Sequence, residues 1–378
     1  MIYLDNAATT FPKPQSVYEA MDHANRTLAF NAGRGSYGKA REATALLDET
    51  KQLLRSLVFA DAGIPVVFSP SITIALNQVL QGIDWPEKAV VYVSPYEHNA
   101  VARTLHALEK QGRVQIRFLP VDGSTLEIDI EQMKYQFIQE KPDAIVCTHI
   151  SNVTGYILPV AEIFAEGKKY GCLTVLDTAQ SLGLVPVDSR IMNADIIAFA
   201  GHKTLYGPLG IGGFINVGVV PLKSHVTGGT GSDSLNLDMP EGAEAKYEAA
   251  SSNIVAIAGL NEALRVLDQK GNYVHEKEIG DYLIGKLGKL ELVKTLLPGN
   301  LENHIGVISF VVDGYASDDV GSILDEEYDI AVRTGYHCAP WIHDVIKSKS
   351  SNGTVRVGLS RFSSKDEVDA LVKALTTI

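Results

Sequence analysis

Short apolar runs alternate with helical patterns through the first 250 residues of the chain. The apolar runs lack a regular polar alternation, so both faces of each predicted strand should be buried. The segments between them suit helices of about ten to fifteen residues, and this succession is typical of βαβ units. We therefore predict an α/β fold whose large domain has a mostly parallel central sheet. The predicted strands are 64–70, 88–95, 114–121, 142–152, 172–181, 194–203 and 210–216, and the helices among them are 71–83, 97–112 and 160–171.

The pattern becomes sparser after about residue 250. An uninterrupted helical pattern at 253–271 predicts one long helix that leads out of the large domain. Strand and helix patterns then alternate to the C-terminus, where we expect a smaller α+β domain. Because a domain usually holds about 100–200 residues, 378 residues fit two of them. The predicted large domain covers residues 15–258, and the small domain covers residues 259–378 together with 1–14.

Composition and charge exclude several classes of protein. A net charge of −12 argues against a general nucleic-acid binder, which needs a basic face. No apolar stretch approaches the roughly 18 residues of a membrane span, and the N-terminus does not read as a signal peptide. Only three cysteines occur, with no CxxC spacing, so we expect a cytoplasmic protein without a metal site. Cys147 and Cys172 lie in apolar strand patterns and should be buried and inert.

Polar residues at the ends of the predicted strands mark the candidate site, because doubly wound sheets bind ligands there. Lys203 follows an apolar run, and desolvation lowers the pKa of a lysine and makes its amine nucleophilic. Asp177 ends another apolar run, and a carboxylate there suits a protonated pyridine nitrogen. Taken singly, the aspartate could be a helix cap and the lysine a surface charge. Together they indicate pyridoxal 5′-phosphate (PLP).

The third cysteine lies in a different setting. Cys338 occupies the polar, turn-prone segment 331–343, directly after His337 and five residues after Arg333. The thiolate is the reactive form of cysteine, and a positive neighbour favours it. We expect a reactive thiol at Cys338, helped by His337 or Arg333, and a surface position for His343.

The chain resembles the cysteine desulfurases of the class V aminotransferase family, which are fold-type I PLP-dependent transferases. The resemblance spans essentially the whole chain. Its R-x-G-x-H-C-A segment is similar to the SufS-type and selenocysteine lyase-like branch. The motifs that carry it are "YLDNAATT" (3–10), "EHNAV" (97–101), "SNVTG" (151–155), "LDTAQ" (176–180), "AGHKTLYGPLGIG" (200–212), "RTGYHCAP" (333–340) and "GTVRVGLS" (353–360).

The resemblance implies a cysteine desulfurase that converts L-cysteine to L-alanine and leaves a persulfide on Cys338. Lys203 would carry PLP and move the α-proton, Asp177 would pair with the pyridine nitrogen, and His98 would stack on the ring. The sulfur would pass to an acceptor protein or a small thiol. The other implied cofactor-binding residues are Gln180, Asn152, Thr73, Ser71 and His202. The implied substrate-binding residues are Arg356, Arg333, Asn152, Ala7 and Ala8.

The resemblance also implies a homodimer with the active site at its interface. The partner chain would complete the phosphate site through the glycine-rich loop at 226–234, with Thr230 or Ser232 as the donor. Neither a membrane nor a nucleic acid is an expected partner.

Two departures from the family pattern leave alternatives open. Ser71-Ile72-Thr73 stands where the family has Gly-Thr-Thr or Gly-Ala-Thr, so Ser71 would replace a missing hydroxyl. Tyr336 stands where the close branch often has a second histidine, which leaves open whether L-cysteine or L-selenocysteine is preferred. A selenocysteine lyase or a direct C–S lyase is the alternative enzyme, and a non-catalytic sulfur-transfer scaffold is the alternative from another class.

Overall fold

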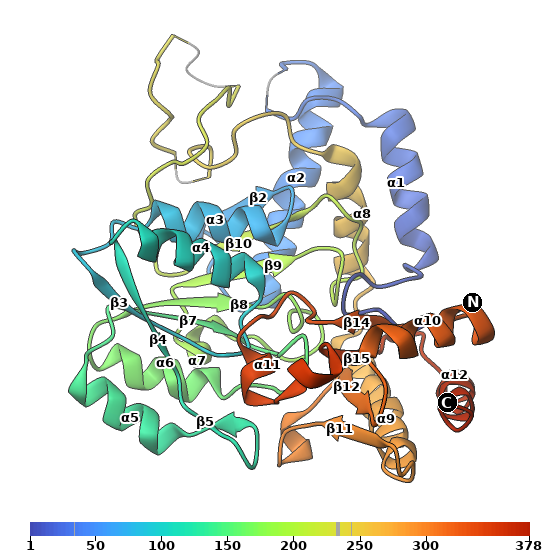
Figure 1. Ribbon diagram of the computed structural model, residues 1–378. Helices are drawn as coiled ribbons and strands as arrows, with labels where there is room; N and C mark the ends of the chain where they lie inside the picture. Colours follow the sequence, from blue (N-terminus) through green and yellow to red (C-terminus); the bar gives the residue numbers. More distant parts are fainter. Residues whose placement is uncertain (34, 232–234, 243) are drawn as a thin grey trace.

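A seven-stranded sheet forms the centre of the computed structural model, which describes residues 1–33, 35–231, 235–242 and 244–378 (Figure 1). Its strand order is β2-β10-β9-β8-β7-β3-β4, and only β10 runs antiparallel to its neighbours. The mostly parallel sheet is therefore confirmed. The strands are β2 (Val66–Ser69), β3 (Ala89–Val93), β4 (Val114–Phe118), β7 (Ala144–Thr148), β8 (Leu173–Asp177), β9 (Ile196–Ala200) and β10 (Gly212–Ile215).

Both faces of this sheet are buried, as the unbroken apolar runs predict. Neighbouring residues of one strand join different apolar clusters: Val146 belongs to the cluster under α3 and α4, and Cys147 to the cluster on the opposite face. Cys147 and Cys172 are buried, and burial raises the pKa of Cys172 to about 12. The helices of this unit are α1 (Gln15–Thr27), α2 (Gly38–Leu57), α3 (Ile72–Gly82), α4 (Asn99–Lys110), α5 (Ile130–Gln139), α6 (Val160–Lys168), α7 (Ser189–Met192) and α8 (Ile254–Arg265).

A second, four-stranded antiparallel sheet with the order β11-β12-β15-β14 has its own apolar core. The N-terminal residues join this unit, because β1 pairs in parallel with β13. Its elements are β1 (Ile2–Tyr3), α9 (Gln269–Leu287), β11 (Val293–Leu296), η1 (Leu301–Asn303), β12 (Val307–Val312), α10 (Ser317–Tyr328), β13 (Ile330–Ala331), β14 (Arg333–Gly335), α11 (Ile342–Val345), η2 (Ser348–Ser351), β15 (Thr354–Gly358) and α12 (Lys365–Leu375).

The prediction of one long helix at 253–271 is wrong. α8 ends at Arg265, and α9 begins at Gln269 after a break. Asp268 causes the restart, because its carboxylate accepts a hydrogen bond from the backbone N–H of Gly271 and caps the new helix. The small hairpin of β5 (Val121–Asp122) and β6 (Glu127–Ile128) was not expected from the sequence pattern. Among the described residues, no helix is both long enough and apolar enough to span a bilayer.

Candidate active site

The site lies where the strand order of the large sheet reverses. From β3 the chain adds β4 on one side, and from β7 it continues to β8 and β9 on the other. Side chains beyond the carboxyl ends of such strands meet in a crevice. A cavity of about 200 Å³ occupies this position. It is lined by Ala7, Ala8, Ser71, Ile72, Thr73, His98, Thr148, Asn152, Asp177, Ala179, Gln180, His202, Lys203, Arg333 and Arg356.

Lys203 and Asp177 line the same cavity although different strands carry them. Burial lowers the pKa of Lys203 to about 8, although the nearby charge of Asp177 acts to raise it. More of the amine is therefore neutral and nucleophilic near neutral pH than for an ordinary lysine. Burial also raises the pKa of Asp177, whose Oδ1 accepts a hydrogen bond from the Ala179 N–H at 2.8 Å. A lysine with a lowered pKa beside a buried carboxylate is the pair that the sequence analysis selected.

His98 is fixed at the start of α4 as its N-cap residue. Its Nδ1 accepts a hydrogen bond from the Ala100 N–H at 3.0 Å, so the proton of the neutral ring resides on Nε2. Burial lowers the pKa of His98 to about 3, and the charge of Lys203 lowers it further. The ring at the cavity is therefore neutral at physiological pH.

The start of α3 lines the cavity at Ser71 and Thr73. The predicted helix start near Ser71 is confirmed, since Ser71 is the N-cap and its Oγ accepts a hydrogen bond from the Ile74 N–H at 3.3 Å. Free N–H groups at a helix N-terminus favour an anion such as phosphate. A side chain at Gly212 would come within 2.8 Å of the Ile72 nitrogen, so glycine allows β10 to approach α3 this closely.

His202 lines the cavity next to Lys203. Its Nδ1 is buried and has no hydrogen-bond partner among the described residues. Lys13, which the sequence analysis did not select, donates a hydrogen bond of 2.7 Å to the main-chain carbonyl of His202. Burial lowers the pKa of Lys13 to about 7. Lys13 therefore ties the N-terminal segment to the loop that presents Lys203.

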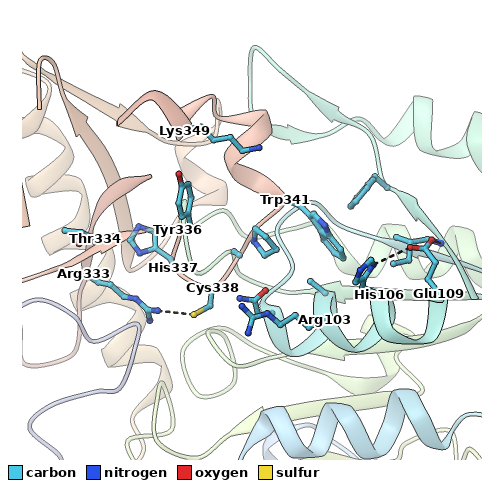
Figure 2. Close-up of a pocket in the computed structure, with 16 residues that line it drawn as sticks. Arg103, His106, Glu109, Arg333, Thr334, Tyr336, His337, Cys338, Trp341 and Lys349 are labelled. Carbon is cyan, nitrogen blue, oxygen red and sulfur yellow. Dashed lines mark hydrogen bonds and ion pairs between the residues drawn. The ribbon is translucent and has the colours of Figure 1, made fainter. Parts of the chain in front are cut away.

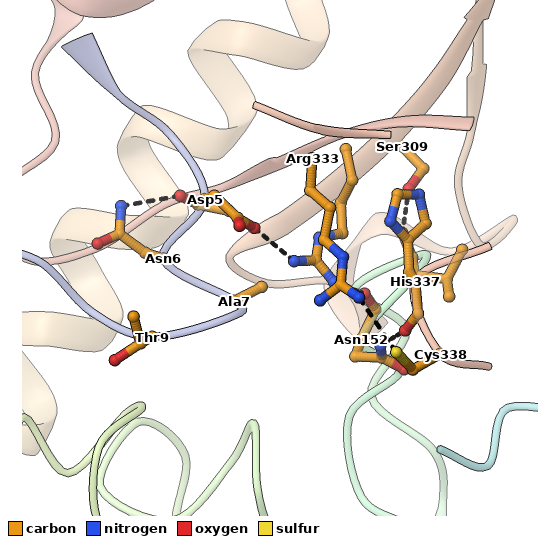
Figure 3. A network of polar contacts seen from close by, with 12 residues as sticks. Asp5, Asn6, Ala7, Thr9, Asn152, Ser309, Arg333, His337 and Cys338 are labelled. Carbon is orange, nitrogen blue, oxygen red and sulfur yellow. Dashed lines mark hydrogen bonds and ion pairs between the residues drawn. The ribbon is translucent and has the colours of Figure 1, made fainter. Parts of the chain in front are cut away.

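Arg356 is buried and held from two sides, by Asp5 and by Asn152, which Figure 3 labels. Its Nη2 donates to Asp5 Oδ1 at 2.6 Å, and its Nη1 donates to the main-chain carbonyl of Asn152 at 3.0 Å. Its Nε has no hydrogen-bond partner among the described residues. Asp5 belongs to a motif that carried the family resemblance, but no role was assigned to it. The sequence signal that could have indicated its pairing with Arg356 is a carboxylate directly after a short apolar run.

The Cys338 loop is fixed by hydrogen bonds to its main chain. The Asn152 side chain donates to the His337 carbonyl at 2.7 Å, and the Asn99 N–H donates to the Cys338 carbonyl at 2.6 Å. His337 and Cys338 both have positive φ, 48° and 58°, which is rare for residues with side chains. Such strain persists only where the surroundings impose it, and it is concentrated at functional sites.

Arg333 is the charged partner of the Cys338 sulfur. Its Nη2 lies 3.1 Å from Sγ, and a guanidinium at this distance stabilises negative charge on sulfur. The expected help from His337 is not found, because its Nε2 pairs with the Thr354 hydroxyl at 2.7 Å. Burial lowers the pKa of His337 to about 2, so the ring is neutral and supplies no positive charge. Cys338 itself lines a neighbouring groove, and Arg333 lines both the groove and the cavity (Figure 2).

Two further expectations concern His343 and the glycine-rich loop. The surface position expected for His343 is wrong, because its ring is fully buried and bonds the Ser348 hydroxyl and the Tyr336 carbonyl. Thr230 lies outside the cavity, in a separate hollow of the glycine-rich loop, so one chain alone does not bring it to Lys203. Ser232 lies outside the described residues.

A buried carboxyl group, that of Glu97, supports the part of the cavity lined by His98 and Thr148. Its Oε1 accepts a hydrogen bond from the Thr148 N–H at 2.7 Å, and burial raises its pKa to about 8. The sequence pattern alone predicted no role for Glu97. Glu97 joins the ends of β3 and β7 and thereby fixes His98 and Thr148 relative to each other.

Comparison with known proteins shows the family to which the chain belongs. The profile of the class-V aminotransferases matches residues 2–371. The chain belongs to the class-V aminotransferase family. Among its relatives, a "Probable cysteine desulfurase" of Aeropyrum pernix is 31% identical and covers 100% of this chain and 94% of its own length. "Probable cysteine desulfurase 2" of Mycobacterium leprae is 30% identical, with 98% and 90% covered.

Solved structures of cysteine desulfurases have the same fold. The apo cysteine desulfurase of Thermococcus onnurineus superposes with a TM-score of 0.90 at 28% identity, covering 100% of this chain and 94% of that one. The S-sulfonic acid form of CsdA from Escherichia coli gives 0.85 at 25% identity, with 99% and 94% covered. The fold-type I PLP fold is thus confirmed for this family member.

Class-V aminotransferases are known PLP enzymes, and the cavity of this chain fits that cofactor. It combines a lysine of lowered pKa, a buried carboxylate, a neutral histidine ring and a helix N-terminus. The buried Nδ1 of His202 is a further polar atom in need of a partner. The lysine matches the aldehyde of PLP, and the carboxylate matches its pyridine nitrogen. The histidine ring matches its aromatic face, and the helix N-terminus matches its phosphate.

Proposed function

We propose that this protein is a PLP-dependent cysteine desulfurase that converts L-cysteine to L-alanine and retains the sulfur on Cys338. The observation that carries the proposal is the position of Arg333. Its side chain lines the cavity of Lys203 and Asp177 and at the same time contacts the Cys338 sulfur at 3.1 Å. The same arginine therefore lies both at the cavity that holds the Lys203 amine and at the Cys338 thiol.

The cofactor would be held by residues of the cavity. Lys203 would bind its aldehyde, Asp177 would keep its ring nitrogen protonated, and the α3 N-terminus would bind its phosphate. When bound, PLP supplies an electron sink for the carbon next to the substrate amine. Because its pKa is lowered to about 8, Lys203 can then accept and return a proton near neutral pH.

The substrate carboxylate would bind Arg356 and Arg333. A planar guanidinium receives a carboxylate through parallel hydrogen bonds, which fixes the direction of the substrate as well as its position. Asp5 and the Asn152 carbonyl already hold two of the Arg356 nitrogens, so its plane is set before the substrate arrives. Ala7, Ala8 and Gln180 line the same wall, and Gln180 donates a hydrogen bond to the Ala7 carbonyl at 2.7 Å.

Cys338 would take the sulfur directly from the substrate. Its thiolate attacks the sulfur of L-cysteine, and a new S–S bond forms as the Cβ–S bond breaks. The electron pair of the broken bond stays with carbon, which is protonated and leaves as alanine. Arg333 stabilises the thiolate before the attack, when its charge is needed.

The homodimer and the cytoplasmic location are parts of the same proposal. Thr230 lies on a loop away from the cavity of its own chain, which suits a donor to the site of a second copy. The three cysteines are free, as in a reducing compartment.

The test is alanine formation from L-cysteine by PLP-loaded protein with dithiothreitol as the thiol acceptor. We expect Cys338→Ala to lower the rate about a hundredfold or more, since it removes the nucleophile. Cys172→Ala is the matched control, because Cys172 is buried away from the cavity. Loss of activity in both variants, or in neither, would contradict the role of Cys338.

A direct lyase acting on L-cysteine or L-selenocysteine is the second candidate. The observation in its favour is that Cys338 lines the groove and not the cavity. For such an enzyme, Cys338→Ala would leave alanine formation unchanged, with sulfide or selenide released instead of a protein-bound persulfide.

A further inference from the structure

A buried carboxyl group in the second domain has no part in the site described so far. Glu276 lies in α9, is 3% exposed and does not line the Lys203 cavity. Its Oε1 accepts a hydrogen bond from the Tyr206 hydroxyl at 3.2 Å, and no ion pair is found for it among the described residues. Burial raises the pKa of Glu276 to about 8, so the group is protonated and uncharged at neutral pH. An apolar residue would fill the same space at a lower desolvation cost, so packing alone does not explain the carboxyl group.

Tyr206 belongs to the loop that presents Lys203. It follows Lys203 by three residues, and its N–H donates to the Lys203 carbonyl at 2.8 Å. The next residue closes the loop, because the Gly207 N–H donates to the Gly201 carbonyl at 2.8 Å. The φ of Tyr206 is 60°, a conformation that persists in a residue with a large side chain only where its surroundings impose it. A shift of the Tyr206 side chain would therefore move the backbone of Lys203.

The second domain imposes this conformation through the side chain of Tyr206. The Tyr206 hydroxyl accepts a hydrogen bond from the Arg361 N–H at 2.7 Å, and the centre of its ring lies 5.6 Å from the Arg361 guanidinium and 6.0 Å from the centre of the Phe362 ring. Since a backbone N–H is a donor only, the hydroxyl proton is left for Glu276, and burial raises the pKa of Tyr206 so that this proton stays in place. Arg361 and Phe362 lie just after the end of β15, the strand that carries Arg356. One hydroxyl group thus connects the loop of the cavity lysine to that strand.

The space beside Glu276 is too small to serve a substrate. A cavity of about 20 Å³ is lined by Glu276 and by part of the N-terminal segment, and Ala7 and Gln180 line both this cavity and that of Lys203. Such a volume holds about one water molecule. Among the described residues that line it, Glu276 and Tyr206 are the only titratable ones. The carboxyl group therefore serves Tyr206 rather than a ligand.

We propose that Glu276 is a positioning residue that acts through the Tyr206 hydroxyl on the Lys203 amine. It sets the place of that amine relative to Arg356 from outside the cavity that both of them line. The inference rests on the proposed function, in which the lysine moves the substrate proton and the arginine binds the substrate carboxylate. In an amino acid the α-proton and the carboxylate are attached to one carbon, so a shift of Lys203 against Arg356 takes the proton out of reach.

Single and double variants test whether the two residues act as one unit. Tyr206→Phe removes the hydroxyl, and Glu276→Leu removes its acceptor. In PLP-loaded protein with L-cysteine and dithiothreitol, we expect each variant to lower kcat about tenfold with a smaller change in KM, because a misplaced base slows proton transfer. The double variant should be no slower than either single one, since the second change removes a bond that is already lost. Unchanged kcat in either single variant, or a double variant slowed by the product of both effects, would overturn the proposal.

Glu276→Gln is the conservative variant. Its amide keeps an acceptor oxygen and a donor, as a protonated carboxyl group has, so kcat should stay within about twofold of the wild type. Tyr92→Phe is the matched control, because it removes another hydroxyl, which bonds the Glu140 carbonyl at 2.9 Å and lies outside the Lys203 cavity. Its kcat should remain unchanged. A loss in Glu276→Gln as large as in Glu276→Leu, or an equal loss in the control, would contradict the positioning role.

The absorbance of bound PLP gives a readout that needs no turnover. Its visible band depends on the protonation of the nitrogen that Lys203 contributes, so the midpoint of a pH titration reports the surroundings of that nitrogen. We expect Tyr206→Phe and Glu276→Leu to shift the midpoint in the same direction by about 0.5 pH unit or more, and Tyr92→Phe to leave it in place. An unchanged midpoint in the first two variants would refute the proposal. Because no substrate is added, this titration is separate from alanine formation by the wild type, which tests the proposed function.

Discussion

At the scale of single residues, the site depends on charged side chains that hydrogen bonds fix in position before any ligand binds. Arg356 is 1% exposed, and a buried guanidinium is tolerated only when it is paired. Asp5 provides that pairing from the N-terminal segment, where the Asn6 N–H also bonds the Gly358 carbonyl. Asp5 is thus a positioning residue that acts on the substrate through Arg356.

Replacing Asp5 separates orientation from folding. In Asp5→Ala we expect the KM for L-cysteine to rise about tenfold with a smaller change in kcat, because ground-state binding of the carboxylate is lost. Asp5→Asn keeps an acceptor oxygen and should recover most of the affinity. Steady-state kinetics with thermal unfolding of each variant makes the measurement. Equal KM values for the wild type and Asp5→Ala would refute the positioning role.

At the scale of elements, an edge strand of the large sheet is protected by side chains. The N–H groups of Val66 and Phe68 on β2 donate to the carboxylates of Glu244 and Glu248 at 2.9 and 2.7 Å. Lys51 of α2, only 2% exposed, pairs with both carboxylates. The free N–H groups of an unprotected edge strand can pair with another molecule and cause aggregation. Here the two glutamates occupy the N–H groups of Val66 and Phe68.

Lys51→Met should destabilise the fold, because it leaves the partly buried Glu248 carboxylate without its cation and Glu244 with Arg55 alone. Breaking a buried ion pair from one side costs about 3–5 kcal/mol. Urea unfolding of the PLP-loaded protein measures the loss in free energy of unfolding. Lys39→Met is the control, since Lys39 and Glu42 form an exposed pair on the same helix that should contribute little. A loss no larger than that of the control would disprove this account of the edge.

At the scale of the whole molecule, the chain presents a loop that its own core does not use. Leu235 and Leu237 are 98% and 101% exposed and follow the glycine-rich segment that carries Thr230. Fully exposed leucines favour burial in an interface. The loop extends from the body near α2 and α3 (Figure 1).

We therefore expect the protein to form a dimer through this loop. Leu235→Asp combined with Leu237→Asp should shift the dimer toward monomer at micromolar concentration, because two charges would enter an apolar interface. Analytical ultracentrifugation gives the mass of each form. Ile138→Asp is the control, at an apolar side chain on α5 that is 68% exposed. A dimer of unchanged strength in the double variant would exclude the loop from the interface.

Much of the fold was predictable because local signals suffice for it. Unbroken apolar runs determine strands that are buried on both faces, and their spacing determines the parallel sheet. The paired choice of Lys203 and Asp177 needed only the apolar runs before them, since desolvation follows from those runs. The break at Asp268 was missed because the capping bond of one aspartate overrides a continuous helical pattern.

The partners of the charged groups were decided by the tertiary structure alone. Asp5 and Arg356 are 351 residues apart and meet only because β1 pairs with β13 and Asp5 bridges to Gly358 of β15. His337 and His343 lie in one turn-prone segment, yet both are buried, and Arg333 is the residue that reaches the Cys338 sulfur. A sequence pattern determines which residues can carry the chemistry, since that depends on side-chain type and local apolarity. Which of these residues are in contact is decided only when segments far apart in the sequence pack together.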